Sequence, residues 1–387
     1  MENHFSLYLR CIPQKFIDMK TPIVLLIFIV SFSGMAQEKE LLDSLAFYGK
    51  LRVHTAVFDD KIELQQNSPR IGLFLQRSLL DNFKVEGTLE FGMNLIDGTQ
   101  FNNDANNVIE FASQPFVKKE TFSSRLAFIG VSHPKWGRIT AGKQWGVYYD
   151  IASYTDNFTV FGGESNGVYS GQTDGGWKGT GRADNAIAYR NSYKNLSVGV
   201  QTQLFSGNTN FAGALQYQLP FNLSLGFSYN HAEIRNAFRE FIEFERKINE
   251  NYLFGAKYKK DNFQIAATYS INHDEFALLD SSDDSFRIVA YPTHGLELFS
   301  NYYVNKKIEI QAGFNRINDI EDNSFFNGDY SLMHYILGLN YHITPSTVAY
   351  TSARIGDSKL VNNARDSNVF LIGFSFNFSY KQNDIKI

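Results

Sequence analysis

The stretch that decides the fold is residues 370–380, FLIGFSFNFSY, close to the end of the chain. Apolar side chains occupy every second position, namely Phe370, Ile372, Phe374, Phe376, Phe378 and Tyr380. The small polar residues Ser375, Asn377 and Ser379 stand between the last of them. Because successive side chains of a strand point to opposite faces, this pattern predicts a β-strand with one apolar and one polar face.

The same alternation returns along the whole chain. Residues 196–201, 223–230 and 308–315 each carry apolar side chains at one parity and polar residues or glycine at the other. Short turns with Asn, Asp or Lys separate such segments, for example at 261–262 and 306–307. Roughly sixteen segments, each about 9–11 residues long, fit the chain without a linker or a solenoid repeat. We therefore expect a single all-β domain of antiparallel strands.

Two all-β architectures fit this alternation, a soluble β-sandwich and a transmembrane β-barrel. Aromatic residues make up 15% of the chain, yet its mean hydropathy is only −0.26. Strands of a membrane barrel are apolar on every second residue only, and aromatic girdles mark both membrane interfaces. Tyrosines suited to such a girdle end several apolar faces: Tyr217, Tyr229, Tyr258, Tyr269, Tyr341 and Tyr380. The sequence therefore favours the barrel.

The N-terminal segment has the order of a secretory signal peptide. Lys15 and Lys20 precede an apolar run at 23–30, and small residues follow as far as Ala36. A helix needs about 20 apolar residues to span a bilayer, so a single-helix anchor is the less favoured alternative. We expect residues 1–36 to be removed after export through the Sec pathway, which leaves 37–387 as the barrel domain.

The cysteine content argues against disulfides and thiolate metal sites, and the net charge argues against binding to nucleic acid. Cys11 is the only cysteine and lies in the segment expected to be removed, so the mature protein would carry no disulfide or thiolate metal site. The formal net charge is −4, which predicts no bulk attraction to nucleic acid. The start of translation stays open between Met1 and Met19, because Met19-Lys20 would itself begin an ordinary signal peptide.

A long segment rich in glycine, aspartate and aromatic residues separates two predicted strands between Tyr149 and Gly181. Loops of this length are uncommon in compact domains and usually have a function. Inside a barrel, this loop could fold inward and narrow the lumen. Gly162-Gly163 would permit a tight bend with positive φ, and Gly175-Gly176 would do the same on the way back.

Several short motifs occur in a recognisable order: Phe47-Tyr48-Gly49-Lys50, Ser124-Arg125-Leu126-Ala127-Phe128-Ile129-Gly130, Gly142-Lys143-Gln144-Trp145-Gly146-Val147-Tyr148-Tyr149-Asp150, Phe161-Gly162-Gly163 and Ala188-Tyr189-Arg190-Asn191. With them the chain resembles the general diffusion porins of the Gram-negative outer membrane. The resemblance implies a 16-stranded antiparallel barrel in that membrane, with the third outer loop folded into the lumen. It also implies a homotrimer among lipid and lipopolysaccharide, passing small hydrophilic solutes and ions by passive diffusion.

The resemblance further implies a constriction with charges on opposing walls, which would set ion preference through their field. The basic wall would consist of Arg70, Arg125, Arg182 and Lys143. The constriction loop would contribute Asp150, Asp156, Phe161, Gly162, Gly163 and Glu164. Any one of these charges alone also fits a solvated strand end or loop.

Two departures from the family pattern bear on function. Val160 stands where the family has a glutamate before Phe-Gly-Gly, and Glu164 would partly replace that charge. We therefore predict weak selectivity that leans toward anions. The chain also continues for residues 381–387 after Tyr380, where the family normally ends on an aromatic residue.

Other function classes remain as alternatives. A sugar or phosphate porin is the nearest of them, and an outer-membrane barrel enzyme or an adhesin is more distant. The sequence contains no His-Glu-x-x-His pair, and His334 and His342 share the parity of one strand, so we expect lumen-facing histidines there. We expect no catalytic residues, no metal and no cofactor.

Overall fold

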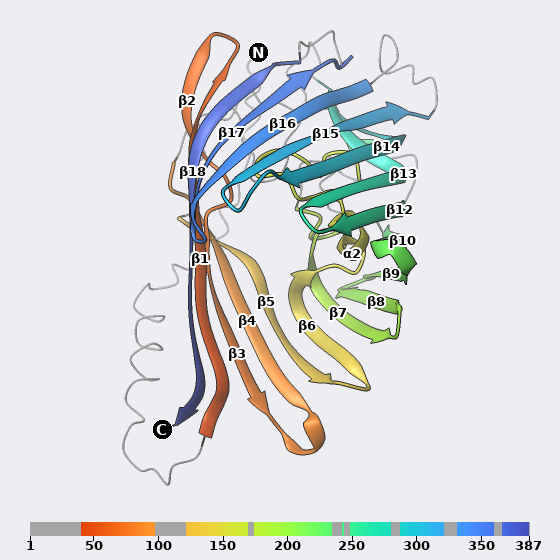
Figure 1. Cartoon of the computed structure of the whole chain (residues 1–387). Helices are drawn as coiled ribbons and strands as arrows, with labels where there is room; N and C mark the ends of the chain where they lie inside the picture. The colour runs from red at the N-terminus through yellow and green to blue at the C-terminus, as the bar shows by residue number, and fades with distance from the viewer. Residues whose placement is uncertain are drawn as a thin grey trace, which may run out of the picture.

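The computed structural model describes residues 40–96, 121–168, 174–233, 242–243, 248–279, 287–320, 331–359 and 366–386. These residues form one curved sheet that closes on itself as a barrel (Figure 1). The predicted signal peptide at 1–36 lies outside the described residues and stays a prediction, as does its boundary with the barrel domain.

The strands are β1 (Glu40–Phe58), β2 (Lys61–Gln66), β3 (Arg70–Ser78), β4 (Lys84–Met93), β5 (Phe122–His133), β6 (Gly137–Trp145), β7 (Arg182–Tyr193), β8 (Leu196–Phe205), β9 (Asn208–Leu219), β10 (Leu223–Glu233), β11 (Ile242–Glu243), β12 (Ile248–Lys260), β13 (Phe263–Leu279), β14 (Arg287–Tyr303), β15 (Ile308–Asp319), β16 (Ser331–Thr344), β17 (Thr347–Gly356) and β18 (Val369–Lys386). A short α-helix, α2 (Tyr149–Ala152), and the 3₁₀ turns Leu80–Asn82 and Pro220–Asn222 complete the named elements. Among the described residues, no helix is long and apolar enough to cross a membrane.

Sixteen long strands make the barrel. Eighteen strands belong to the sheet, and two of them, β2 with six residues and β11 with two, are short additions. Each long strand pairs antiparallel with the next, and β1 pairs with β18 from Glu40↔Lys386 to Val57↔Phe370. This last ladder closes the sheet, so the predicted antiparallel barrel of about sixteen strands is confirmed.

The residues after Tyr380 extend the closing ladder. Lys381 pairs with Ala46, and Lys386 pairs with Glu40. In Figure 1 the two strands lie side by side down to the lower end of the barrel, which the hairpin of β3 and β4 also reaches. The expected short tail is therefore a continuation of β18, since backbone pairing with β1 satisfies its hydrogen-bonding groups.

The two faces of the sheet carry the chemistry that the alternation predicted. On β18, Phe370 is 53% exposed and Ile372 is 68% exposed, whereas the intervening Leu371 is 3% exposed. Buried positions of the other strands are often polar, for example Gln203, Asn230 and Asn251. A soluble sandwich would bury its apolar face. The apolar face here points outward, as a strand facing lipid requires.

The connections differ at the two ends of the barrel. Two-residue turns such as Lys194-Asn195 and Asp261-Asn262 lie at the end where β1 begins and β18 stops. Longer connections, including 59–69, 146–181 and 357–368, lie at the opposite end. Such asymmetry is typical of outer-membrane barrels, whose periplasmic turns are short.

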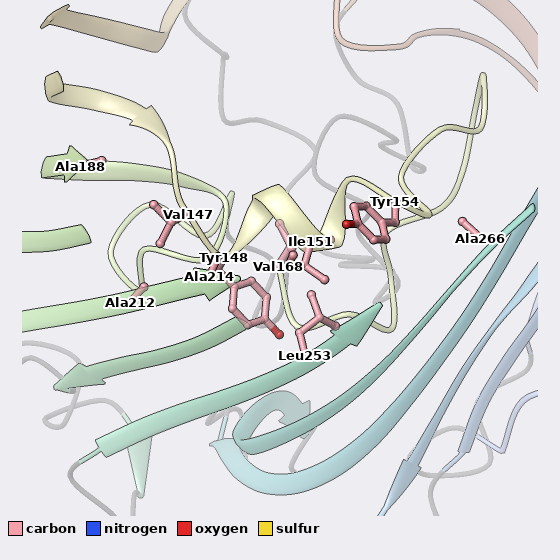
Figure 2. Packing of buried hydrophobic residues seen from close by; sticks show 11 residues of the cluster. Val147, Tyr148, Ile151, Tyr154, Val168, Ala188, Ala212, Ala214, Leu253 and Ala266 are labelled. Atoms are coloured by element: carbon pink, nitrogen blue, oxygen red, sulfur yellow. The ribbon is translucent and has the colours of Figure 1, made fainter. Parts of the chain in front are cut away.

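The connection at 146–181 packs against one side of the barrel through α2 and the residues beside it. Val147, Tyr148, Ile151 and Tyr154 form one apolar cluster with alanines and Leu253 from the strands (Figure 2). The strand residues of this cluster are Ala188, Ala212, Ala214, Leu253 and Ala266.

Small residues on the strands make this close packing possible. A Cβ atom added at Gly226 would lie 2.5 Å from Ile151, and one added at Gly255 would lie 2.8 Å from it. A Cβ atom at Gly295 would lie 1.6 Å from the carbonyl oxygen of Ser165. The glycines are therefore needed where the strands and the connection approach each other.

Candidate functional site

An ion pair anchors the base of the 146–181 connection. Arg190 on β7 donates from Nε to Asp150 Oδ2 at 2.8 Å and from Nη2 to Asp150 Oδ1 at 3.1 Å. It also donates to the carbonyl oxygen of Trp145 at 2.9 Å. Burial raises the pKa of the Asp150 carboxyl although Arg190 acts against it. Asp150, predicted near the base of the loop, thus holds α2 against β7.

A buried carboxylate of β14 binds the middle of the same connection. Glu297 is 1% exposed and accepts hydrogen bonds from Thr155 Oγ1 at 2.6 Å, Ser165 N at 3.0 Å and Asn166 Nδ2 at 2.9 Å. Further on, Thr159 Oγ1 donates to Asn340 Oδ1 of β16 at 3.0 Å. Residues 155–166 therefore contact the polar face of strands far away in the sequence.

A cavity of about 300 Å³ lies between this connection and the first strands of the barrel. Its described lining residues are Lys50, Arg52, Asn67, Ser68, Arg70, Arg125, Trp145, Tyr149, Asp156, Asn157, Phe158, Thr159, Val160, Phe161 and Arg182. Five of these are basic residues, namely one lysine and four arginines, and one, Asp156, is acidic. The lining is therefore strongly asymmetric in charge, with the cations on β1, β3, β5 and β7.

Neighbouring carboxylates orient three of the five cations. Arg125 donates from Nε to Glu90 Oε1 at 2.9 Å and from Nη1 to Ser68 Oγ at 2.9 Å. Arg70 lies 4.0 Å from the same glutamate. Arg182 donates from Nε to Asp174 Oδ2 at 3.2 Å. These contacts hold the guanidinium groups in fixed directions, and arginine stays charged at any physiological pH.

The two cations of β1 were missed by sequence reasoning. The side chain of Lys50 makes no hydrogen bond or ion pair within the described part of the chain. Arg52 donates from Nε to the carbonyl oxygen of Asn67 at 3.0 Å and from Nη1 to the carbonyl oxygen of Thr159. Lys50 and Arg52 are two residues apart on one strand, so their side chains point to the same face of the sheet. This spacing is the sequence signal that could have identified both.

The fourth predicted cation lies elsewhere. Lys143 Nζ is 3.0 Å from Asp184 Oδ1 and 3.6 Å from Asp174 Oδ2, and it does not line the cavity. Burial acts to raise the pKa of Asp174, but Arg182 and Lys143 beside it hold that pKa below its usual value. Lys143 therefore belongs to an ion-pair network next to the cavity.

The two predicted loop acids are placed differently. Asp156 lines the cavity and accepts a hydrogen bond from Tyr149 Oη at 2.6 Å. Glu164 is 7% exposed, does not line the cavity, and accepts a hydrogen bond from Asn315 Nδ2 at 3.3 Å. Burial acts to raise the pKa of Glu164, but His334 and Arg354 outweigh it and hold that pKa below its usual value.

The remaining residues singled out on the loop are apolar residues and glycines. Phe161 lines the cavity with φ 68°, and the following Gly162 and Gly163 have φ 97° and 73°. The predicted bend with positive φ is thus confirmed. On the return path, Gly175 also has positive φ, at 73°, whereas Gly176 does not, so the prediction for the second glycine of that pair is wrong. Val160 is 2% exposed and packs with residues of β16, β17 and β18.

The sequence Gly163-Glu164-Ser165-Asn166-Gly167 also fits the Gly-x-Ser-x-Gly pattern of hydrolase nucleophiles. That pattern requires a sharp turn from a strand into a helix and a base beside the serine. Here Ser165 lies in neither element, and its buried hydroxyl has no hydrogen-bond partner. The structural context that would make this serine a nucleophile is therefore not met.

Comparison with known proteins agrees with the fold. Residues 23–382 match the family model described as Gram-negative porin. Outer membrane porin F of Xenorhabdus nematophila is 26% identical over 286 residues, which cover 66% of this chain and 74% of that protein. Among solved structures, OmpF of Salmonella typhi superposes with a TM-score of 0.68 at 18% identity, covering 86% of this chain and 97% of that one. An anion-selective porin from Comamonas acidovorans gives a TM-score of 0.61 at 13% identity, covering 87% and 100%.

Fold and sequence together define a pore-forming protein of the bacterial outer membrane. The chain belongs to the Gram-negative porin family.

Proposed function

We propose that this porin is a passive, weakly selective channel for small hydrophilic solutes and ions, and that its conduction pathway prefers anions. The observation that carries the proposal is the cavity lined by five cations and one carboxylate. Charged rings and clusters of this kind set ion preference in water-filled pores. Solutes follow their own gradient, without a chemical reaction and without a cofactor.

The 146–181 connection serves as the constriction loop in this proposal. Its hydrogen bonds to Glu297, Gln311 and Asn340 support a position within the lumen, because these residues belong to the polar face of β14, β15 and β16. Residues 156–161 then form the narrow part opposite the arginines.

Three further features belong to the proposal through family membership. The mature chain begins after Ala36 following export, assembles as a homotrimer, and lies among lipopolysaccharide in the outer membrane. The outward apolar face, with Phe370 and Ile372 strongly exposed, supports contact with lipid or with a second copy.

A phosphate-selective porin is the second candidate. Lys50 and Arg52 raise the number of cations around one cavity to five, which is a denser basic site than the sequence had indicated. Inorganic phosphate in the bath would then reduce the chloride current through the channel, whereas a general channel would pass both anions.

Recording from the refolded mature protein in a planar bilayer tests the proposed function. We expect stepwise conductance, and a reversal potential under a potassium chloride gradient that shows a modest preference for chloride. A strong preference for potassium, or no conductance from correctly folded protein, would contradict the proposal.

A further inference from the structure

A buried charge cluster lies outside the lining of the cavity. His334 Nδ1 is 2.6 Å from Glu164 Oε2, and His334 Nε2 is 3.2 Å from Asp366 Oδ1. Arg354 Nη1 lies 3.8 Å from Glu164 Oε1. The four side chains are between 1% and 8% exposed, and none of them lines the cavity.

The geometry fixes the protonation of the histidine. Both ring nitrogens face carboxylate oxygens, and an ionised carboxylate can only accept hydrogen bonds. A neutral imidazole has one donor and would turn a lone pair toward one of the two carboxylates. The imidazolium form satisfies both contacts. In this form the negative charges of Glu164 and Asp366 are balanced by the positive charges of His334 and Arg354, so the net charge of the cluster is zero.

The cluster joins four parts of the chain. Glu164 belongs to the 146–181 connection, His334 to β16, Arg354 to β17, and Asp366 to the connection that precedes β18. Ser358, from that same outer connection, donates its hydroxyl to Asp366. The loop proposed to form the constriction is thereby tied to the outer rim of the barrel.

Few other groups contact the cluster. Asn315 of β15 donates to Glu164 at 3.3 Å and does not titrate. Arg354 of β17 stays charged at any physiological pH. Glu297 of β14 is the remaining carboxyl with an electrostatic influence from Glu164, and its hydrogen bonds go to Thr155, Ser165 and Asn166. His334 is thus the one described group of the cluster whose ordinary charge change falls near neutral pH.

We propose that His334 is a pH-responsive positioning residue that, when protonated, latches Glu164 and its part of the loop to β16 and to the outer connection. The inference rests on the proposed function, because the latch acts on conductance only if the loop lies in the conduction pathway. Loss of the His334 proton leaves the cluster with one excess negative charge. A lone pair on one ring nitrogen then faces a carboxylate oxygen, and this contact is repulsive. The latch is therefore present at neutral and mildly acidic pH and is lost as rising pH removes the proton.

Single-channel recording between about pH 5 and pH 9 tests the latch, with current noise and closures as the readout. In the wild type we expect steady steps at the lower pH values and more frequent closures as the pH rises. His334→Gln should show frequent closures at every pH. Glu164→Gln removes one opposing charge, so the transition should move toward acid. His342→Gln is the matched control, because His342 lies on the same strand and contacts Glu309 at 3.3 Å instead.

The outcomes separate the latch from the channel itself. The latch is overturned if His334→Gln shows the same pH dependence of channel closures as the wild type. It is also overturned if His342→Gln abolishes that pH dependence. If His334→Gln does not fold, Glu164→Gln provides the test. The latch is then overturned if closures become frequent at the same pH in Glu164→Gln as in the wild type. A wild type that conducts with the same noise at every pH refutes the latch alone, whereas a folded wild type that passes no current refutes the proposed function.

Discussion

Replacing Lys50 and Arg70 together by glutamate is expected to reverse the ion preference of the channel. Both residues line the cavity, and they pair across β1 and β3 in the register Lys50↔Arg70. The double substitution turns two positive charges into two negative ones. At a separation of about 10 Å in water each unit charge contributes roughly 0.4 kcal/mol, so four charges of difference amount to roughly 1–2 kcal/mol, and the permeability ratio of chloride to potassium should fall about tenfold.

The measurement is the reversal potential under a salt gradient, compared with that of Lys143→Gln. Lys143 is a cation near the cavity that does not line it, so its neutralisation should change the ratio far less. Equal effects of the two variants would show that general surface charge, rather than the lining of the cavity, sets the preference.

Glu297→Ala is expected to free the loop. The substitution leaves three donors of the loop, on Thr155, Ser165 and Asn166, without their acceptor. Each unsatisfied buried donor costs about 1–3 kcal/mol, so the loop should leave its position against β14. We expect large current noise at all voltages and an altered mean conductance in planar bilayers.

Two variants control for this effect. Glu297→Gln keeps one acceptor oxygen, enough for Thr155 and Asn166, but turns an NH2 group toward Ser165 N, so its current noise should lie between those of the wild type and Glu297→Ala. Glu86→Ala removes another buried carboxylate, which forms an ion pair with Arg138 of β6. Noise as great in Glu86→Ala as in Glu297→Ala would contradict the specific role of Glu297 in holding the loop.

The fold followed from the sequence because one simple rule governs it. Side chains alternate between lipid and lumen, so the run from Phe370 to Tyr380 already distinguished the two faces. Arg70, Arg125 and Arg182 were assigned to the basic wall through the resemblance to a known family, and all three line the cavity.

The rest of the site depends on features that the sequence does not display. The pairing of β6 with β7 shifts between Gly142 and Gln144, so parity alone could not give the direction of Lys143. Glu164 meets His334, which is 170 residues further along the chain. No local sequence pattern predicts such a contact. The charge of Glu164, expected to face the predicted basic wall, is instead held by His334 of β16 and Arg354 of β17.

The most direct test of the central claim is chemical block of a single cysteine in the proposed constriction. Cys11 is the only cysteine of the sequence and lies in the segment expected to be removed, so Asn157→Cys would provide one reactive thiol. Asn157 is exposed and lines the cavity, whereas Lys306→Cys, in an exposed turn between β14 and β15, is the control. We predict that a negatively charged thiol reagent lowers the single-channel current through Asn157→Cys and leaves that through Lys306→Cys unchanged. Complete labelling of Asn157→Cys without loss of current would contradict a conduction pathway through this cavity.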